Sequence, residues 1–448
     1  MKHSLLPHQI EDAAFLASRA FAGNWSKMRT GKTLTQLEAI RLLDVVDKVY
    51  HAVIIVGPPI SLSMWKAEFE DFFPGCSAQI LKTGKNKVDP DADALVMSYA
   101  IAAKRRDELK ALGAKVLVLD ESHALKTISA KRTKAILGKH GLCESVEHTY
   151  MLSGTPSTRY SDDLFSFLCR ADAAGMKERV GKVDMGRFRL RYCITQKKKF
   201  SASQRFPIEV VVGNRNLTEL NEWMFDGGLA VRRESVEGMP DLTTNRLTVD
   251  LELDPELRQM LKAMEKQTVA QIQEDVANKE GHISTMRRKL GVAKVKHSVT
   301  EIVDRIEAGN GPILVGAWHT NVIDALYDAL KSKKIAVDVI DGRTTSKARD
   351  MYVADFNRGS TQVLVGQISA MGVAIDLSGG GGHIVMVEED WSPAINEQFF
   401  YRMMNFGETA HPVHADIFTS DTKLDKAVQR INAAKSRGHN TMMETDNA

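Results

Sequence analysis

Three short stretches of this sequence carry side chains suited to binding and cleaving a triphosphate. The first, Ser26 to Thr33, ends in Gly-Lys-Thr just before an expected helix at Leu34 to Leu43. Such a loop wraps backbone N–H groups around phosphate oxygens at a helix N-terminus. Lys32 would reach the β- and γ-phosphates, and the Thr33 hydroxyl would ligate Mg²⁺. Ser26 replaces the first glycine of the general pattern, and a chance Gly-Lys-Thr at a helix start is the alternative interpretation.

The second stretch holds two adjacent carboxylates, Asp120 and Glu121, after the apolar run Lys115 to Leu119. Open α/β sheets bind ligands at the carboxyl ends of their strands. There Asp120 can hold the Mg²⁺ shell, and Glu121 can orient and deprotonate an attacking water. The alternative is an acidic exit from a strand, which the upstream Gly-Lys-Thr disfavours. In the third stretch, Ser153 to Pro156, small hydroxyl residues end another expected strand and can sense the nucleotide state.

A parallel sheet would bring these stretches together. Apolar runs at Ala52 to Val56, Ala94 to Tyr99 and Thr149 to Leu152 predict further buried strands. Alternating strands and helices from 311 to 387 predict a second such sheet. We therefore expect an α/β fold with two domains, 1–240 and 241–448.

Two regions interrupt this alternation. The first domain is expected to carry a mainly helical protrusion after residue 160, with a basic run at Lys197 to Lys199 that is either a solvated face or a DNA contact. The second domain is expected to carry a helical insertion at about 254–310, opened by Asp254 as N-cap and Pro255 at the first helical position. Arg287 to Lys289 in this insertion is a phosphate-facing patch or a solvated helix face.

The composition is that of a globular protein. Of 448 residues, 43% are hydrophobic and 26% charged, and the net charge of +3 is too small to argue for nucleic acid by itself. No run approaches the roughly 18–20 apolar residues of a membrane-spanning helix, and the N-terminus lacks a signal-peptide core. The four cysteines are scattered and form no metal-ligand pair, so we expect them to be reduced. These features favour a cytoplasmic location and exclude a membrane partner.

The motifs together resemble one family. Leu6 to Gln9, Met28 to Thr33, Asp120 to His123 and Ser153 to Pro156, in this order, resemble helicase superfamily two and, more narrowly, the Swi/Snf-type DNA translocases. The compact layout most resembles the annealing-helicase, HepA-related branch. The resemblance implies two RecA-like domains in tandem, an ATP hydrolase that uses ATP and Mg²⁺ between its lobes, and double-stranded DNA, forked or partly single-stranded, as partner. It also suggests a monomeric motor from a bacterium or a virus-infected bacterial cell.

The resemblance further implies a role for individual residues. ATP-binding positions are Gln9, which can pair with adenine, and Arg29, Thr30, Gly31, Lys32, Thr33 and Gly372. Thr33 and Asp120 would hold the metal, and the catalytic residues would be Lys32, Glu121 and Arg402. Coupling positions are Ser153, Thr155, Asp376 and Gln398. Positions near DNA are Trp65, Lys66, Ser98, Tyr99, Lys131, Arg132, Thr344 and Ser369.

The second half departs from the family pattern. Asp376 replaces the usual asparagine, Ala374 a glycine, and Arg343 a small hydroxyl residue. The last box has two arginines three residues apart in the family, here Arg402 and Asn405. An arginine finger is worth about 10³ or more in rate, and Asn405 carries no charge. Two alternatives to a DNA-dependent ATPase therefore stay open: a nucleotide-bound nucleic-acid clamp with weak or no hydrolysis, and a strand-separating DNA or RNA helicase.

Overall fold

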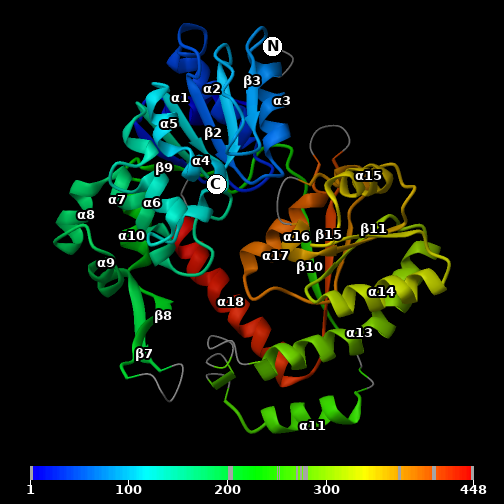
Figure 1. The fold of residues 1–448 in the computed structure, drawn as a ribbon. Coiled ribbons are helices and arrows are strands. Elements are labelled where there is room, and N and C mark those ends of the chain that lie inside the picture. The colour runs from blue at the N-terminus through cyan, green and yellow to red at the C-terminus, as the bar shows by residue number, and fades with distance from the viewer. Residues whose placement is uncertain are drawn as a thin grey trace. The chain divides into compact units, whose positions relative to one another are not determined.

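The chain forms two compact units. A computed structural model describes residues 4–199, 205–249, 251, 253–268, 271–272, 275, 281–371, 375–405 and 410–444. The first unit comprises Met1–Val236 and Gly438–Ala448, and the second comprises Glu237–Arg437 (Figure 1). The sequence analysis placed the boundary at residue 240 and assigned all later residues to the second domain. In the structure the chain returns to the first unit at Gly438.

The first unit is built on a parallel sheet. Its strand order in the described part of the chain is β3-β4-β2-β5-β6-β1-β9. The strands are β1 (Phe21–Asn24), β2 (Val53–Gly57), β3 (Ala78–Leu81), β4 (Ala94–Ser98), β5 (Val116–Leu119), β6 (His148–Leu152) and β9 (Ala230–Val231). The predicted strands correspond to β2, β4, β5 and β6. The sequence does not predict β1 and β3, because Gly23 and Asn24 in β1 and Gln79 in β3 interrupt an apolar run.

Both faces of this sheet are covered. In β2, Ile54 and Val56 belong to one hydrophobic cluster, while Val53 and Ile55 belong to the cluster on the other face. This double burial explains the uninterrupted apolar run in β2, because successive side chains point to opposite faces. The helices of this region are α1 (Pro7–Ala17), α2 (Lys32–Leu43), α3 (Leu62–Phe72), α4 (Tyr99–Lys104), α5 (Arg106–Ala111) and α6 (Lys131–Leu137).

The region after residue 160 is not only helical. It contains α7 (Phe165–Ala171), α8 (Ala173–Val180), α9 (Met185–Tyr192), β7 (Cys193–Lys198), β8 (Ile208–Asn214) and α10 (Leu217–Met224). Strands β7 and β8 pair antiparallel and stand out from the neighbouring helices (Figure 1). The sequence does not predict these strands, because the lysine run at 197–199 is typical of a solvated charge run and obscures the strand alternation. We call β7, β8 and the described residues between them the β7–β8 hairpin.

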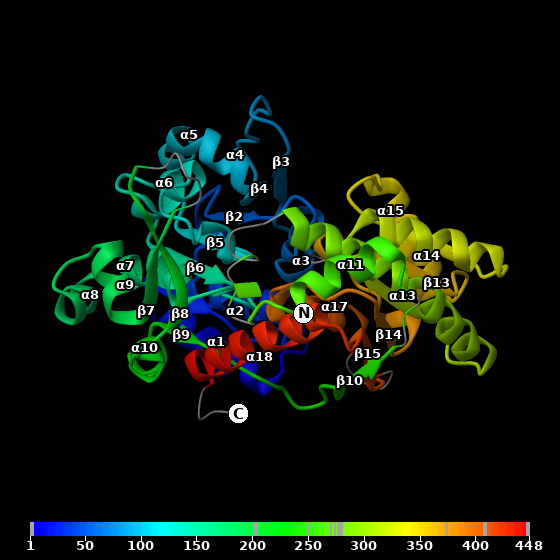
Figure 2. The ribbon, with the colours of Figure 1, turned by 90° about the horizontal axis from the view of Figure 1, so that it is seen from below.

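The second unit is built on another parallel sheet. Its strand order in the described residues is β10-β15-β14-β11-β13-β12, and Figure 2 shows β10, β15 and β14 in succession. The strands are β10 (Leu242–Thr248), β11 (Ile313–Ala317), β12 (Val337–Ile340), β13 (Val363–Gln367), β14 (His383–Met386) and β15 (Val413–Thr419). The predicted α/β fold with two parallel sheets is confirmed.

The helices of the second unit begin with the predicted insertion. Asp254 caps α11 through a 2.8 Å bond from the Leu257 N–H to its carboxylate, and Pro255 opens the helix as predicted. The helices are α11 (Pro255–Met264), α13 (Gly281–Glu307), α14 (Thr320–Ser332), α15 (Ser346–Asn357), α16 (Ile368–Met371), α17 (Pro393–Phe400) and α18 (Lys423–Met443). From Gly438 onward, α18 belongs to the first unit. In the described ranges, no helix is long and apolar enough to cross a membrane.

Candidate nucleotide site and nucleic-acid contacts

Three neighbouring strands of the first unit deliver the predicted chemistry to one edge of the sheet. β1 leads into the Ser26–Thr33 loop, β6 into Ser153, and β5 into Asp120 and Glu121. Because all three strands run parallel, their carboxyl ends share an edge, which is where open α/β sheets bind ligands. The Ser153 N–H donates to Asn24 O at 3.2 Å, which joins the ends of β6 and β1.

The Ser26–Thr33 loop has the backbone of an anion-binding turn. Arg29 and Gly31 adopt positive φ of 65° and 79°, so successive N–H groups can turn toward one point. Gly31 is the N-cap of α2, and Lys32 and Thr33 begin that helix. The Lys32 ammonium donates to Ser26 O and Lys27 O, each at 2.7 Å, and therefore lies across the loop.

Ser26 fits the loop without the glycine of the general pattern. It is absent from the positions with positive φ, and its side chain is buried. Its hydroxyl accepts the Arg233 N–H at 3.1 Å, just after β9, and Lys27 N donates to Arg233 O at 2.9 Å. The serine thus ties the phosphate loop to the edge of the sheet.

The first turn of α1 packs against this loop. Gln9, 3% exposed, donates from its amide to Gly31 O at 3.3 Å and accepts the Leu6 N–H at 2.8 Å. His8 Nε2 lies 3.0 Å from Thr30 O. The sequence analysis gave His8 no role, although its position beside Gln9 in the first helical turn was a usable signal. The buried Thr30 is held by its hydroxyl, which donates to Lys27 O at 2.8 Å.

Asp120 is positioned by two aromatic residues that were predicted to face DNA. Trp65 Nε1 donates to Asp120 Oδ2 at 2.9 Å, and the Tyr99 hydroxyl donates to Asp120 O at 2.7 Å. Trp65 is 1% exposed and Tyr99 7%, so neither offers a surface to nucleic acid. The prediction of a DNA contact took account of their place in the motif order but not of their burial. In the structure Trp65 orients the Asp120 carboxylate, and Tyr99 holds the Asp120 main chain.

The two carboxylates influence each other electrostatically. Burial and the negative charge of Glu121 raise the pKa of Asp120 from 3.8 to about 6, against the hydrogen bonds from Trp65 and Ser61. Glu121 adopts a positive φ of 49°, a strained backbone for a residue with a Cβ. Raised carboxyl pKa values and local strain are common at functional sites.

A histidine links Glu121 to the Ser153 turn. His123 Nδ1 lies 3.2 Å from Glu121 Oε2 and 3.3 Å from Ser153 Oγ. Ser153 Oγ accepts the Thr155 N–H at 3.1 Å, and both residues are 1% exposed. A Cβ on Gly154 would lie 3.0 Å from Met28, so the turn and the phosphate loop are in close contact. The predicted catalytic base and the two predicted coupling residues are thereby brought together.

The remaining candidate DNA-contact residues of the first unit differ in accessibility. Lys131 and Arg132 are exposed at the start of α6. Lys66 is partly buried and donates to Ala78 O at 2.6 Å. Ser98 caps α4 by accepting the Ile101 N–H at 3.4 Å. Lys131 and Arg132 are therefore the members of this set best placed to meet a phosphate backbone.

The predicted residues of the second unit lie partly outside the described residues. Gly372 and Ala374 fall there. Arg402 donates to Ile375 O at 3.4 Å, and its own carbonyl accepts the Leu377 N–H at 2.9 Å, which brings Arg402 next to Asp376. Gln398 is buried in α17.

Two further candidates of the second unit follow β12 and β13. Thr344 is partly buried and its hydroxyl accepts the Asp341 N–H at 3.0 Å, whereas Ser369 is exposed on α16. Arg343, which replaces a small hydroxyl residue, pairs with Asp324 and Asp341, each at 2.6 Å. This pairing turns the Arg343 charge toward its own unit.

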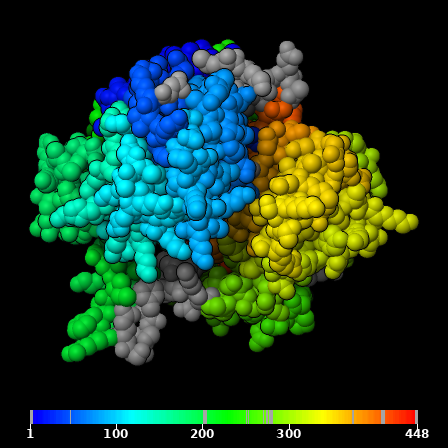
Figure 3. Space-filling model, turned by 45° about the horizontal axis from the view of Figure 1, so that its top comes forward, coloured from blue at the N-terminus to red at the C-terminus, as the bar shows by residue number. Residues whose placement is uncertain are grey.

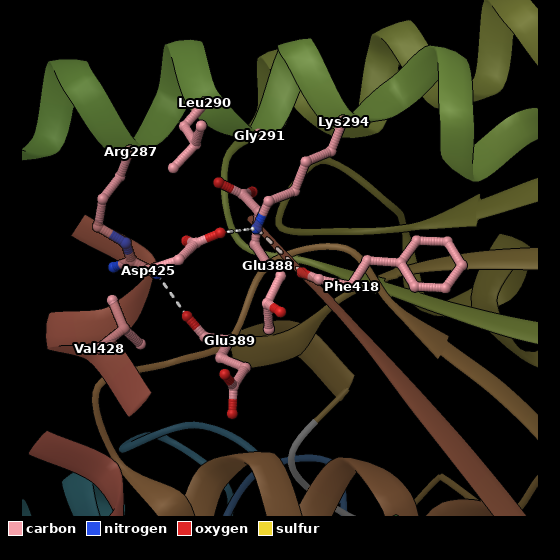
Figure 4. A pocket seen from close by; sticks show the side chains of 10 residues that line it. Arg287, Leu290, Gly291, Lys294, Glu388, Glu389, Phe418, Asp425 and Val428 are labelled. Atoms are coloured by element: carbon pink, nitrogen blue, oxygen red, sulfur yellow. Dashed lines mark hydrogen bonds and ion pairs between the residues drawn. The ribbon is translucent and has the colours of Figure 1, made fainter. Parts of the chain in front are cut away.

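A small charged cavity lies in the second unit against α13. It has a volume of about 20 Å³, room for one water. The Lys294 ammonium contacts Asp425 at 2.7 Å and donates to Phe418 O at 2.9 Å, as the dashed lines of Figure 4 show. Arg287 is buried and stacks over Trp391 at 4.6 Å, so it is neither the phosphate-facing patch nor the solvated face considered from the sequence. These charges anchor α13.

Comparisons with known proteins define the class of this chain. Residues 26–172 match the SNF2-related domain, and residues 294–407 match the helicase conserved C-terminal domain. The chain belongs to the Swi/Snf-type family of helicase superfamily two, with two RecA-like parallel-sheet domains in tandem.

Two relatives of known name share a low sequence identity with this chain. The chain is 24% identical over 418 residues to the SWI/SNF-related matrix-associated actin-dependent regulator of chromatin subfamily A-like protein 1 of Xenopus laevis, covering 91% of this chain and 41% of that protein. It is also 24% identical over 428 residues to the DNA annealing helicase and endonuclease ZRANB3 of Mus musculus, covering 91% and 38%. The chain thus spans about two fifths of the length of these relatives.

A solved structure also aligns with the chain. It is the Sulfolobus solfataricus SWI2/SNF2 ATPase core in complex with dsDNA, with a TM-score of 0.44 and 16% sequence identity, covering 100% of this chain and 98% of that one.

Proposed function

We propose that this chain is a DNA-dependent ATPase that translocates on or remodels double-stranded DNA. The observation that carries the proposal is the convergence of the phosphate loop, the Asp120–Glu121 pair and the Ser153 turn at the ends of three adjacent strands. Membership of the Swi/Snf-type family supports DNA as the partner. The DNA annealing activity in the name of one relative makes strand rewinding or fork remodelling a specific form of this proposal.

The residues present fit ATP and Mg²⁺. The Lys32 ammonium binds two loop carbonyls, a geometry in which phosphate oxygens can replace either acceptor. Asp120 has a pKa raised to about 6, and a divalent cation would stabilise its ionised form. Thr33 and Asp120 would therefore hold Mg²⁺, which when bound neutralises charge on the phosphates. We assign the adenine to Gln9, whose amide donates to Gly31 O at the edge of the loop.

Proton transfer is assigned to Glu121. Its carboxylate would accept the proton of the attacking water, and His123 would fix its orientation from 3.2 Å. We assign Arg402 of the second unit to the charge that develops on the transferred phosphoryl group, with ATP held between the two lobes. A change in the Ser153–Thr155 turn would then report the nucleotide state to the rest of the first unit.

A second candidate function follows from the residue type at position 405. Asn405 is neutral where the family carries its second arginine, which favours a nucleotide-bound clamp with slow hydrolysis. Retained hydrolysis is the better-supported function, because Lys32, Thr33, Asp120 and Glu121 are all present. We expect Arg402 to supply the charge alone.

The test compares nucleic acids as activators. Phosphate release by the wild type and by Asn405→Arg is measured without nucleic acid and with duplex DNA, single-stranded DNA or RNA. We expect the strongest stimulation of the wild type by duplex DNA, and a faster rate for Asn405→Arg. Strongest stimulation by RNA would point to an RNA-directed motor, and absence of turnover in both proteins would end the enzyme proposal in favour of the clamp.

A further inference from the structure

The β7–β8 hairpin carries a concentrated positive charge. Residues 193–214 contain three lysines and one arginine but a single carboxylate, a net charge of +3 in this short segment. The entire chain of 448 residues also has a net charge of only +3. The rest of the chain is therefore neutral on balance, and this hairpin is a local attractor for a polyanion.

Large apolar side chains accompany this charge. Phe206 is 69% exposed, the highest value among the exposed large hydrophobic side chains of the described residues, and Ile208 is 54% exposed. The Arg205 guanidinium lies 5.3 Å from the centroid of the Phe206 ring. An exposed aromatic ring beside an arginine is the arrangement on which unpaired bases stack.

The pairing of the two strands places the single carboxylate, that of Glu209, on one face of the hairpin and leaves the other face without it. Lys198 pairs with Ile208 and Gln196 with Val210, so these four side chains share one face. Glu209 pairs with Lys197 on the opposite face, where the Thr195 hydroxyl donates to its carboxylate at 2.5 Å. Within the described strands, the Lys198 face thus offers cationic and apolar groups without an acidic one.

The base of the hairpin is fixed to the first unit. Cys193 is fully buried, and Ser161 holds both strands. Its N–H donates to Asn214 Oδ1 at 2.9 Å, and its hydroxyl donates to Tyr192 O at 2.6 Å. The Ser161 segment continues directly from the Ser153 turn of the nucleotide site. Figure 1 shows β7 and β8 extending away from this base, and the same green segment projects at the lower left of Figure 3.

We propose that the β7–β8 hairpin binds a single-stranded DNA segment that adjoins a duplex, with Phe206 stacking on an unpaired base and Lys198 and Arg205 contacting its phosphates. Bases inside a duplex are already stacked on one another, whereas an unpaired base presents its face to an aromatic ring. This inference rests on the proposed DNA-dependent function and deepens it, because it assigns a binding site for the single-stranded segment to this hairpin.

The test uses the full-length protein and two labelled DNAs, a blunt duplex and the same duplex with a single-stranded arm. Fluorescence anisotropy gives the affinity of each for the wild type and for Phe206→Ala. We expect the wild type to prefer the armed duplex. Phe206→Ala should lose about 5- to 100-fold in affinity for the armed duplex, the range for one base–aromatic stack, and keep its affinity for the blunt duplex.

Further variants control for folding and charge. Phe206→Trp should retain the preference, because indole also stacks. Leu190→Ala removes another side chain of this region, 60% exposed, and should leave both affinities unchanged. Lys198→Gln should reduce the slope of log affinity against log salt concentration for the armed duplex by about one, the value for one lost phosphate contact. Lys182→Gln, on the loop after α8, should leave this slope unchanged.

The outcomes separate this inference from the proposed function. If the wild type binds neither DNA, both fail. If the wild type binds blunt duplex and its ATP turnover responds to that duplex, while Phe206→Ala equals the wild type on both DNAs, only the hairpin inference fails. It is also overturned if Phe206→Ala leaves DNA binding intact but changes the sedimentation of the free protein, which would make this face a protein interface.

Discussion

The raised pKa of Asp120 makes a prediction about stability. A carboxyl group whose pKa is higher in the folded than in the unfolded chain binds its proton more tightly when folded, so its ionisation opposes folding. With a folded pKa of about 6 against 3.8, this cost is absent below about pH 4 and complete above about pH 6. The difference of about two pKa units corresponds to about 3 kcal/mol.

Asp120→Asn removes this cost and should stabilise the protein. The amide keeps one acceptor oxygen, so it can accept from Trp65 Nε1 and Ser61 but then loses the bond from the Glu121 N–H. Losing one hydrogen bond subtracts about 1 kcal/mol, which leaves a net gain of about 2 kcal/mol at neutral pH. The same variant loses the proposed Mg²⁺ ligand and its ATP turnover, a trade of activity against stability.

Urea titrations of the full chain at several pH values, without nucleotide or Mg²⁺, measure this gain. We expect Asp120→Asn to exceed the wild type in free energy of unfolding above pH 6 and to lose this advantage as the pH falls toward 4. Asp93→Asn, which removes a carboxylate that accepts only the Ser77 N–H in its neighbourhood, should give no gain. An Asp120→Asn protein that is less stable than the wild type by the same amount at every pH would refute the electrostatic reasoning.

The other predictions concern the phosphate loop and its support. Lys32→Ala should abolish ATP turnover while circular dichroism and DNA affinity stay close to the wild type; preserved turnover would mean that the nucleotide binds elsewhere. Gly31→Ala should weaken binding of a fluorescent ATP analogue, because Gly31 has a φ of 79° and a Cβ there would approach Gln9 Nε2 to 2.1 Å; Gly75→Ala, with a φ of 93° and no atom within 4 Å, is the control with backbone strain alone. Trp65→Phe removes a donor that lowers the pKa of Asp120, so the Mg²⁺ concentration for half-maximal turnover should rise, whereas a loss of duplex DNA affinity at unchanged Mg²⁺ dependence would restore Trp65 to the DNA contacts. Ser26→Gly removes the acceptor of the Arg233 N–H and should cost about 1 kcal/mol in a urea titration without improving ATP affinity; a gain in affinity would show that the serine is a defect of the loop.

Much of the nucleotide site was predictable because its chemistry depends on short motifs at strand ends. A neighbouring apolar run is enough to predict that four residues lie at the edge of a sheet: Gly31, Lys32, Asp120 and Glu121. Their mutual distances, however, depend on the strand order β5-β6-β1, which no local pattern specifies. The bond from Trp65 to Asp120 joins residues 55 positions apart and had no sequence signal.

Burial explains why the structure does not support a DNA contact for Trp65 and Tyr99. A tryptophan and a tyrosine in motif positions are equally compatible with a nucleic-acid contact and with a core position, and the structure places Trp65 and Tyr99 in the core. The β7–β8 hairpin was missed for a different reason. Its lysine run suggested solvated surface, and the alternation that makes it a strand appears only once Lys198 is paired with Ile208.

The most direct test of the central claim is phosphate release by Glu121→Gln. The wild type and this variant are compared at saturating ATP and Mg²⁺, with and without duplex DNA, together with binding of a fluorescent ATP analogue. We expect DNA-stimulated phosphate release by the wild type, and a Glu121→Gln variant that binds the analogue equally well but releases almost no phosphate. The proposed role of Glu121 would be contradicted if Glu121→Gln released phosphate at the wild-type rate. The proposed DNA dependence would be contradicted if duplex DNA did not change the wild-type rate.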